Sequence, residues 1–207
     1  MRTSGLTLAA ALTLAQGIAV AQGSWGKVKS WTGSVTIEAT DIRKGEGVSS
    51  TMTYKATGDF KISDDMLPDG SHMQWPMPSV EAMSDPKQAE TVYDRWLAHV
   101  VASYEAKGVG ESGQPFTVKC TADNRQPSKV GVTIHPTEPT YVFEVSPPEA
   151  KFKCSGPSGG PTPNGRLQQA NFRMTGARKE PGPIGDTKTF TVGTTTVKVT
   201  YNMAPSR

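Results

Sequence analysis

Concentrated charge of one sign is absent from this sequence. Its 22 Lys and Arg residues and 19 Asp and Glu residues give a formal net charge of +3, and the basic residues are scattered along the chain. Nucleic-acid binding depends on clustered positive charge that tracks the phosphate backbone. We therefore expect no nucleic-acid partner.

Long hydrophobic runs are also absent after the first 21 residues. A membrane-spanning helix needs about 20 consecutive apolar residues, so we expect no membrane span in the mature protein. The N-terminal segment contains one charged residue, Arg2, then a mostly apolar run over 6–20 with the small residues Ala19 and Ala21 at its end. This order is typical of a signal peptide cleaved after Ala21. We predict a secreted or periplasmic protein formed by residues 22–207.

Cysteine is scarce, because Cys120 and Cys154 are the two that the chain contains. They do not have the Cys-x-x-Cys spacing of redox-catalytic pairs. An oxidising compartment favours a bond between them, and Cys120 alternates with apolar residues at Phe116 and Val118. We therefore predict a structural disulfide between Cys120 and Cys154, with both side chains directed into one core.

Alternation of apolar and polar residues is the main pattern that is present. Such a period of two is typical of half-buried strands, and clusters of Gly and Pro between the alternating segments favour turns. The segments expected to form strands are 31–37, 52–62, 130–134, 141–145, 197–203 and a short stretch around 172–174. Short strands without intervening helices predict an all-β fold, an antiparallel β-sandwich or barrel, with residues 22–207 as a single domain.

Residues 85–107 fit two kinds of secondary structure. Ser84 and Pro86 favour a helix start, and apolar residues then recur at helical spacing, yet from Trp96 onward they also alternate with a period of two. One short helix near residues 85–95, followed by a strand, accommodates both patterns. The choice between helix and strand stays open for this segment.

A weak internal similarity links two segments that each begin with tryptophan. WTGSV occupies residues 31–35 and WLAHV occupies residues 96–100. If both open equivalent sets of strands, the domain contains a loose internal duplication that starts near residues 31 and 96.

Four of the eight methionines lie between residues 66 and 83, together with one of the three histidines. Thioether and imidazole groups are suitable ligands for Cu(I), and Trp75 could cover a bound cation with its ring face. His72, Met73, Trp75 and Met77 look like the ligand set of small periplasmic Cu(I)/Ag(I) chaperones of the β-barrel type. The resemblance implies a metal site formed by His72, Met73 and Met77, with Cu(I) as cofactor. The alternative is that these methionines and the tryptophan fill gaps in a packed connection.

Residues 154–161, CSGPSGGP, resemble the segment around the nucleophile of chymotrypsin-like proteases, and His99, Asp123 and Ser158 follow the order of that family's catalytic residues. The resemblance implies a hydrolase with this triad. Pro157 stands where the family has the Asp that fixes the active conformation, and Asp123 and Ser158 are too close in sequence for the strands that should separate them. A Gly/Pro loop explains the segment better.

No motif in the sequence identifies a reaction. Exposed Pro and Gly loops on a disulfide-linked sheet are suited to presenting a contact surface. We therefore expect an exported, non-catalytic binding or structural protein whose partner is an unknown protein or surface ligand. A Cu(I)/Ag(I)-binding protein is the first alternative, and a hydrolase is the second.

Overall fold

The computed structural model describes residue 28 and residues 30–45, 47–63, 65–66, 72–74, 97–110, 113–127, 129–135, 140–156, 167, 169–177 and 180–206. In these residues the chain forms twelve antiparallel strands in two sheets, and they contain no α-helix. The predicted all-β antiparallel fold is confirmed. No helix among the described residues has the length and apolar character needed to cross a membrane.

Seven strands form the larger sheet, in the order β11-β12-β1-β2-β5-β6-β9. Their bounds are β1 (Ser30–Gly45), β2 (Val48–Ser63), β5 (Leu97–Val109), β6 (Pro115–Pro127), β9 (Lys153–Ser155), β11 (Ile184–Val192) and β12 (Thr195–Ser206). Strand β1 pairs with β12 on one side and with β2 on the other, so the last strand of the chain lies beside the first.

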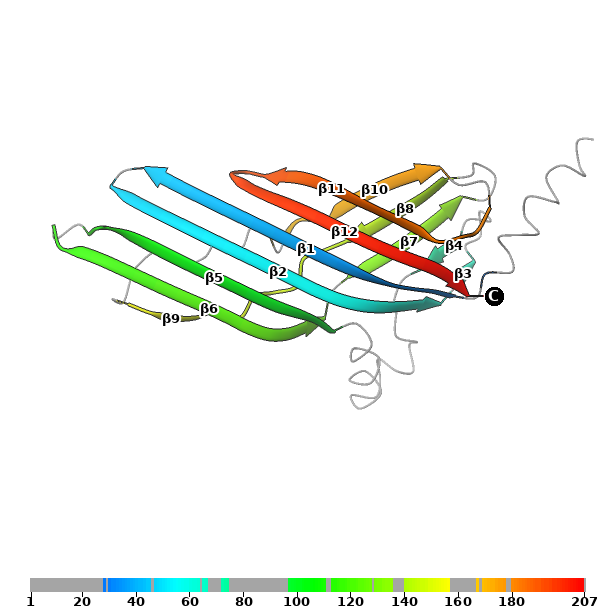
Figure 1. The fold of residues 1–207 in the computed structure, drawn as a ribbon, viewed down its shortest axis with the longest axis horizontal. Helices are drawn as coiled ribbons and strands as arrows, with labels where there is room; N and C mark the ends of the chain where they lie inside the picture. The colour runs from blue at the N-terminus through cyan, green and yellow to red at the C-terminus, as the bar shows by residue number, and fades with distance from the viewer. Residues whose placement is uncertain are drawn as a thin grey trace, which may run out of the picture.

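Five strands form the smaller sheet, in the order β10-β8-β7-β4-β3. Their bounds are β3 (Asp65–Met66), β4 (His72–Gln74), β7 (Val130–His135), β8 (Thr140–Val145) and β10 (Phe172–Ala177). In Figure 1 the small sheet lies behind one end of the large sheet, the end at which the C-terminus is marked. We call this the two-sheet end.

Aromatic side chains fill the space between the sheets at the two-sheet end. Phe143 of β8 is fully buried and stacks on Tyr201 of β12, with ring centroids 4.0 Å apart and nearly parallel planes. The ring of Phe60 of β2 also lies against Phe143, with ring centroids 6.0 Å apart. The Tyr201 hydroxyl donates a hydrogen bond of 3.2 Å to the Tyr141 hydroxyl, so the polar end of this buried ring has a partner. Burial and that hydrogen bond raise the pKa of Tyr201.

The opposite end of the large sheet is covered differently. The chain leaves β8 and runs along the inner side of β2 and β6 as far as β9, and we call residues 146–156 the strap. Tyr54 of β2 donates a hydrogen bond of 2.8 Å to the carbonyl oxygen of Pro148, and burial raises the pKa of the Tyr54 phenol. Pro147, Pro148 and Ala150 are buried. We call this part of the molecule the strap end.

The segments expected to form strands from their alternation do form strands, as β1, β2, β7, β8, β10 and β12. Residues 97–109 form β5, which settles this part of the ambiguous segment as a strand. Residues 85–96, with the expected short helix near 85–95, lie outside the described residues, as does the predicted signal peptide over residues 1–21. The internal duplication starting near residues 31 and 96 stays a prediction.

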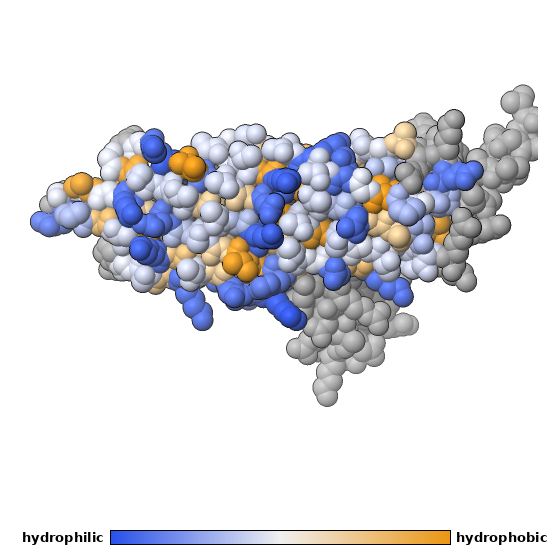
Figure 2. Space-filling model, in the orientation of Figure 1, coloured by the Kyte–Doolittle hydropathy of each residue, from blue (hydrophilic) through white to orange (hydrophobic). Residues whose placement is uncertain are grey.

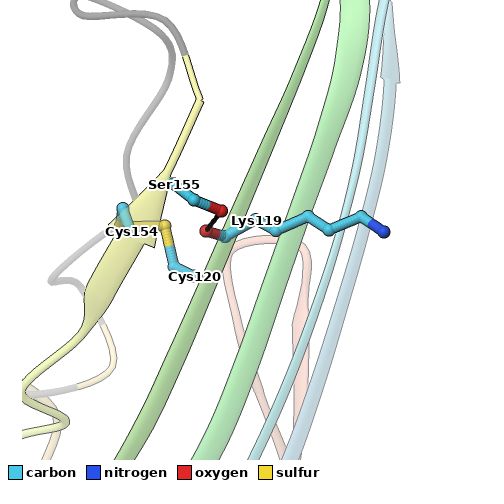
Figure 3. Close-up of a disulfide and its surroundings, with 4 residues drawn as sticks. All are labelled: Lys119, Cys120, Cys154 and Ser155. Atoms are coloured by element: carbon cyan, nitrogen blue, oxygen red, sulfur yellow. Dashed lines mark hydrogen bonds between the residues drawn. A yellow bond between two sulfur atoms is a disulfide. The ribbon is translucent and has the colours of Figure 1, made fainter.

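The predicted disulfide between Cys120 and Cys154 is present (Figure 3). The two residues are direct partners of β6 and β9, and their Cα atoms are 4.0 Å apart. Cys120 is 1% exposed, but Cys154 is exposed. The expectation that both side chains enter the core is therefore wrong for Cys154. Strand β9 is the edge of the large sheet, so solvent reaches it where no further strand pairs with it.

Candidate functional site

The predicted metal ligands fall on the short strands at the edge of the small sheet and on residues beyond them. His72 and Met73 lie in β4, whereas Met77 lies outside the described residues, as does Trp75. The backbone register makes Met66 of β3 the direct partner of His72. The fold thus brings a second methionine position next to His72, which sequence spacing alone does not show. The metal site itself stays a prediction.

Two of the three residues in the protease-like order do meet. His99 of β5 and Asp123 of β6 are exposed, and the His99 Nε2 atom lies 2.8 Å from the Asp123 Oδ1 atom. Ser158 lies outside the described residues. Strand β9 carries the chain away from this pair, because Ser155 is the partner of Lys119, six positions and roughly 20 Å along β6 from the partner of His99. Among the described residues, no serine of the protease-like segment lies near the His99–Asp123 pair.

We call the side of the large sheet that faces away from the small sheet and the strap the outer face. Six exposed hydroxyl residues form one line across it, each the direct register partner of the next, and we call them the hydroxyl row: Thr191, Thr196, Thr40, Thr53, Ser103 and Thr121. At about 4.8 Å between neighbouring strands, the row is about 24 Å long. Within it, the Thr53 and Ser103 hydroxyls are hydrogen-bonded at 2.7 Å.

A shorter line of hydroxyl residues lies four positions away along the strands. It consists of Thr187, Thr200, Thr36 and Thr57, and it continues to His99 as the next partner. The intervening line contains charged residues, among them Lys55 and Glu38, whose Nζ and Oε1 atoms are 3.1 Å apart. Hydroxyl lines and a charged line therefore alternate on one face.

Figure 2 shows this face as mostly hydrophilic, with isolated apolar spots. Three large apolar side chains among the described residues are exposed, Ile42 at 58%, Val101 at 48% and Val109 at 56%. Ile42 and Val101 each lie two positions along their strand from a member of the hydroxyl row, so they project from the same face. Apolar contacts are thus available beside the hydroxyl groups.

A shallow depression of about 190 Å³ lies at the strap end, lined by Ser49, Ser50, Thr51, Glu105 and Lys107. The Lys107 Nζ atom is 2.6 Å from the Glu105 Oε1 atom. This hydrogen bond holds the pKa of Glu105 below its ordinary value, and the charges of Lys107 and Lys119 add to the effect. The depression is polar and open, so it extends the outer face without forming an enclosed cavity.

One buried carboxylate has a structural role. Asp41 accepts hydrogen bonds of 2.7 Å from Arg43 Nε and 2.7 Å from Thr194 Oγ1, which ties the turn between β11 and β12 to β1. Burial of Asp41 opposes ionisation, but the bonds from Arg43 and Thr194 outweigh it and hold the pKa of this carboxyl below its ordinary value. Sequence patterning does not identify Asp41 as a buried residue, because a charged residue in a strand ordinarily indicates the exposed face.

Neither metal ligands nor relatives identify the function directly. Across the described part of the chain, no three residues among His, Cys, Asp and Glu are grouped so that they could hold a metal ion. No protein-family model, curated protein or solved structure matches this chain. Its function therefore has to be inferred from its own residues.

Proposed function

We propose that this chain is an exported, non-catalytic binding protein whose contact surface is the outer face of the large sheet. The observation that carries the proposal is the hydroxyl row, six exposed hydroxyl residues in register on six strands. Each hydroxyl can donate and accept hydrogen bonds. A ligand that fits such a row is long and presents polar groups at a repeat close to the strand spacing.

An extended polysaccharide is the ligand class that meets these requirements. Its hydroxyl groups would meet the hydroxyl row, and its C–H faces would contact the exposed side chains of Ile42 and Val101. The face is also rigid, because β-branched threonine side chains have few rotamers and five of the six strands, all except the edge strand β11, have a neighbouring strand on both sides. Little side-chain entropy is then lost when the ligand binds.

The signal-like N-terminal segment and the disulfide support export. Disulfides persist in secreted and periplasmic proteins and are rare in the cytosol. An exported protein can meet polysaccharides of a cell surface or of the surroundings. The N-terminus of the secreted protein, measured by intact mass, tests export: a product that keeps residues 1–21 would contradict it.

Sedimentation with insoluble polysaccharides tests the ligand class. The mature protein is mixed with suspensions of cellulose, chitin and a β-1,3-glucan, and the bound fraction is measured. We expect retention on at least one of them, and at least tenfold weaker retention for the variant Thr40→Val, Thr53→Val, Thr196→Val. The matched control Thr32→Val, Thr117→Val removes exposed hydroxyls of the same face outside the row and should bind as the wild type does. No retention, or equal loss in both variants, would overturn the assignment.

Binding of Cu(I) or Ag(I) is the second candidate. The observation that favours it is the backbone pairing of Met66 with His72, which adds a possible thioether ligand to the predicted His72, Met73 and Met77. Calorimetric titration with Ag(I) should then show saturable uptake that is reduced by Met73→Leu with Met77→Leu. Met52→Leu in the large sheet is the control. Absence of stoichiometric uptake would leave these methionines as packing residues.

A further inference from the structure

Apart from the disulfide, the strap is held by scattered hydrogen bonds, among them one of 2.9 Å from the Ser146 N–H to the Lys129 carbonyl oxygen, and by the burial of Pro147, Pro148 and Ala150. Asn124 of β6 donates a hydrogen bond of 3.1 Å to the carbonyl oxygen of Glu149 and accepts one of 3.0 Å from the backbone N–H of Lys151. Tyr54 adds the bond to Pro148. Strand β9 pairs with β6 through three residue pairs, whereas β5 and β6 pair through thirteen. Such a short edge pairing is weak without a covalent link.

The strap covers an apolar part of the sheet. Tyr54, Val118 and Ala122 are buried on the inner side of β2 and β6. Gly156, at the end of the strap, lies so close to β6 that a Cβ atom there would be 2.7 Å from the carbonyl oxygen of Thr117. If the strap moved away, this apolar surface and the backbone edge of β6 at residues 119–121 would be uncovered.

The two residues of the disulfide differ in their exposure to solvent. Cys154 lies on the edge strand β9 and is exposed, whereas Cys120 of the neighbouring strand β6 is buried. Next to the disulfide, the Ser155 hydroxyl donates a hydrogen bond of 3.4 Å to the Lys119 carbonyl oxygen. Thiol–disulfide exchange needs access of an attacking thiolate to one sulfur. Cys154 is the exposed residue of this pair, so we expect an external thiolate to attack there.

We infer that the Cys120–Cys154 disulfide is a redox switch that holds the strap on the sheet, and that its reduction by a dithiol opens the strap end while the two-sheet end stays folded. One thiolate of the dithiol attacks the sulfur of Cys154, and Cys120 leaves as a thiolate that takes up a proton. The second thiol of the reductant then displaces Cys154. The dithiol ends as a disulfide, and both cysteines end as thiols. This inference does not depend on the proposed ligand.

The two-sheet end has contacts that do not involve the strap. Phe143 packs between Tyr201 and Phe60, and Phe172 of β10 lies 4.9 Å from Phe190 of β11 between ring centroids. These residues connect the two sheets directly. Local opening without global unfolding is expected where one region has many buried apolar contacts and its neighbour has few.

Hydrogen exchange followed by mass spectrometry tests the switch. The mature protein is compared with and without dithiothreitol, with reduction verified by thiol alkylation under native conditions. We expect at least tenfold faster exchange over residues 116–122 and 147–155 after reduction, unchanged exchange over 141–145 and 197–203, and increased fluorescence of a hydrophobic dye. The variant Cys120→Ala, Cys154→Ala should show the open pattern with and without reductant, whereas Tyr54→Phe should keep a reductant-dependent change.

Three outcomes would overturn the inference. The cysteines could resist dithiothreitol until the whole protein unfolds. Exchange could remain unchanged after verified reduction, which would show that the noncovalent contacts hold the strap. Protection could also be lost equally at both ends, which would make the disulfide a link for global stability only.

Discussion

The apolar inner side of the large sheet is covered differently at its two ends. Both have an inner side lined with apolar residues that must be covered. At the two-sheet end a second sheet covers them, and aromatic side chains such as Phe143 interlock between the layers. At the strap end, the described cover is a single mostly irregular segment, attached by one disulfide, a few hydrogen bonds and the burial of Pro147, Pro148 and Ala150. We therefore expect packing to dominate stability at the two-sheet end, and the disulfide to contribute more at the strap end.

The replacement Phe143→Ala should have the largest effect. It removes a fully buried ring that contacts both Tyr201 and Phe60, and Phe→Ala in a core typically costs about 3–5 kcal/mol. Urea denaturation should show this loss in the free energy of unfolding. A loss below about 1 kcal/mol is the range of an ordinary substitution. It would contradict the expectation that packing dominates stability at the two-sheet end.

The replacement Gly156→Ala, at the end of the strap, should have the next largest effect on the free energy of unfolding. Gly156 has φ +134°, a conformation that L side chains rarely adopt, and its backbone closely approaches Thr117. Gly156→Ala should cost about 1–3 kcal/mol from backbone strain, with the close approach adding to it. The control Gly113→Ala also has positive φ, 75°, but open space around it, so it should cost less. Thermal unfolding of both variants measures the difference, and equal losses would show that the strap's close approach to β6 is unimportant.

Asp41 of β1 is the register partner of Thr195, the first residue of β12. Its replacement tests a contact that belongs neither to the strap nor to the aromatic packing at the two-sheet end. Asp41→Asn should lower the free energy of unfolding by about 1–2 kcal/mol at neutral pH, because hydrogen bonds to a charged group are lost. The folded-state pKa of Asp41 is lowered, so its contribution is present above the unfolded pKa of about 3.9 and is lost as pH falls through the folded value. The difference between wild type and variant should therefore shrink below about pH 4. A constant difference from pH 7 to pH 2.5 would contradict this account.

The smallest effect is expected on the outer face. Thr53→Val removes an exposed hydroxyl whose partner is Ser103, and valine favours strands as threonine does. Its free energy of unfolding should stay within about 0.5 kcal/mol of the wild type, while retention on polysaccharide falls. A large loss of stability would mean that the hydroxyl row is structural.

Alternation predicts the strands wherever one side is buried and the other meets water. It succeeds for β2, β8 and β12 for this reason. It misses β11, where the inner positions include Asp186 and Lys188 before Phe190, so the apolar period is broken at an edge strand. Ala150 and Phe152 also alternate with Cys154, but the strand there, β9, begins only at Lys153. The chain there forms the strap, since Pro147 and Pro148 have no N–H group for sheet pairing.

The hydroxyl row could not be predicted from the sequence. Its members come from six strands whose order in the sheet differs from their order in the chain, and the row exists only in the register between them. In the sequence, each threonine reads as an ordinary strand residue. The His99–Asp123 pair, by contrast, was selected for its order in the chain, and the structure brings the two residues together for a different reason, the adjacency of β5 and β6.

The pairing of β1 with β12 places a constraint on how the chain acquires its structure. Residues at opposite ends of the sequence, such as Ser30 and Ser206, are direct partners in the large sheet. Pairings between such distant segments form slowly, because a long loop must close before any contact is gained. Until residues 195–206 pair with it, one side of β1 has no partner strand, so completion of the large sheet depends on this slow step.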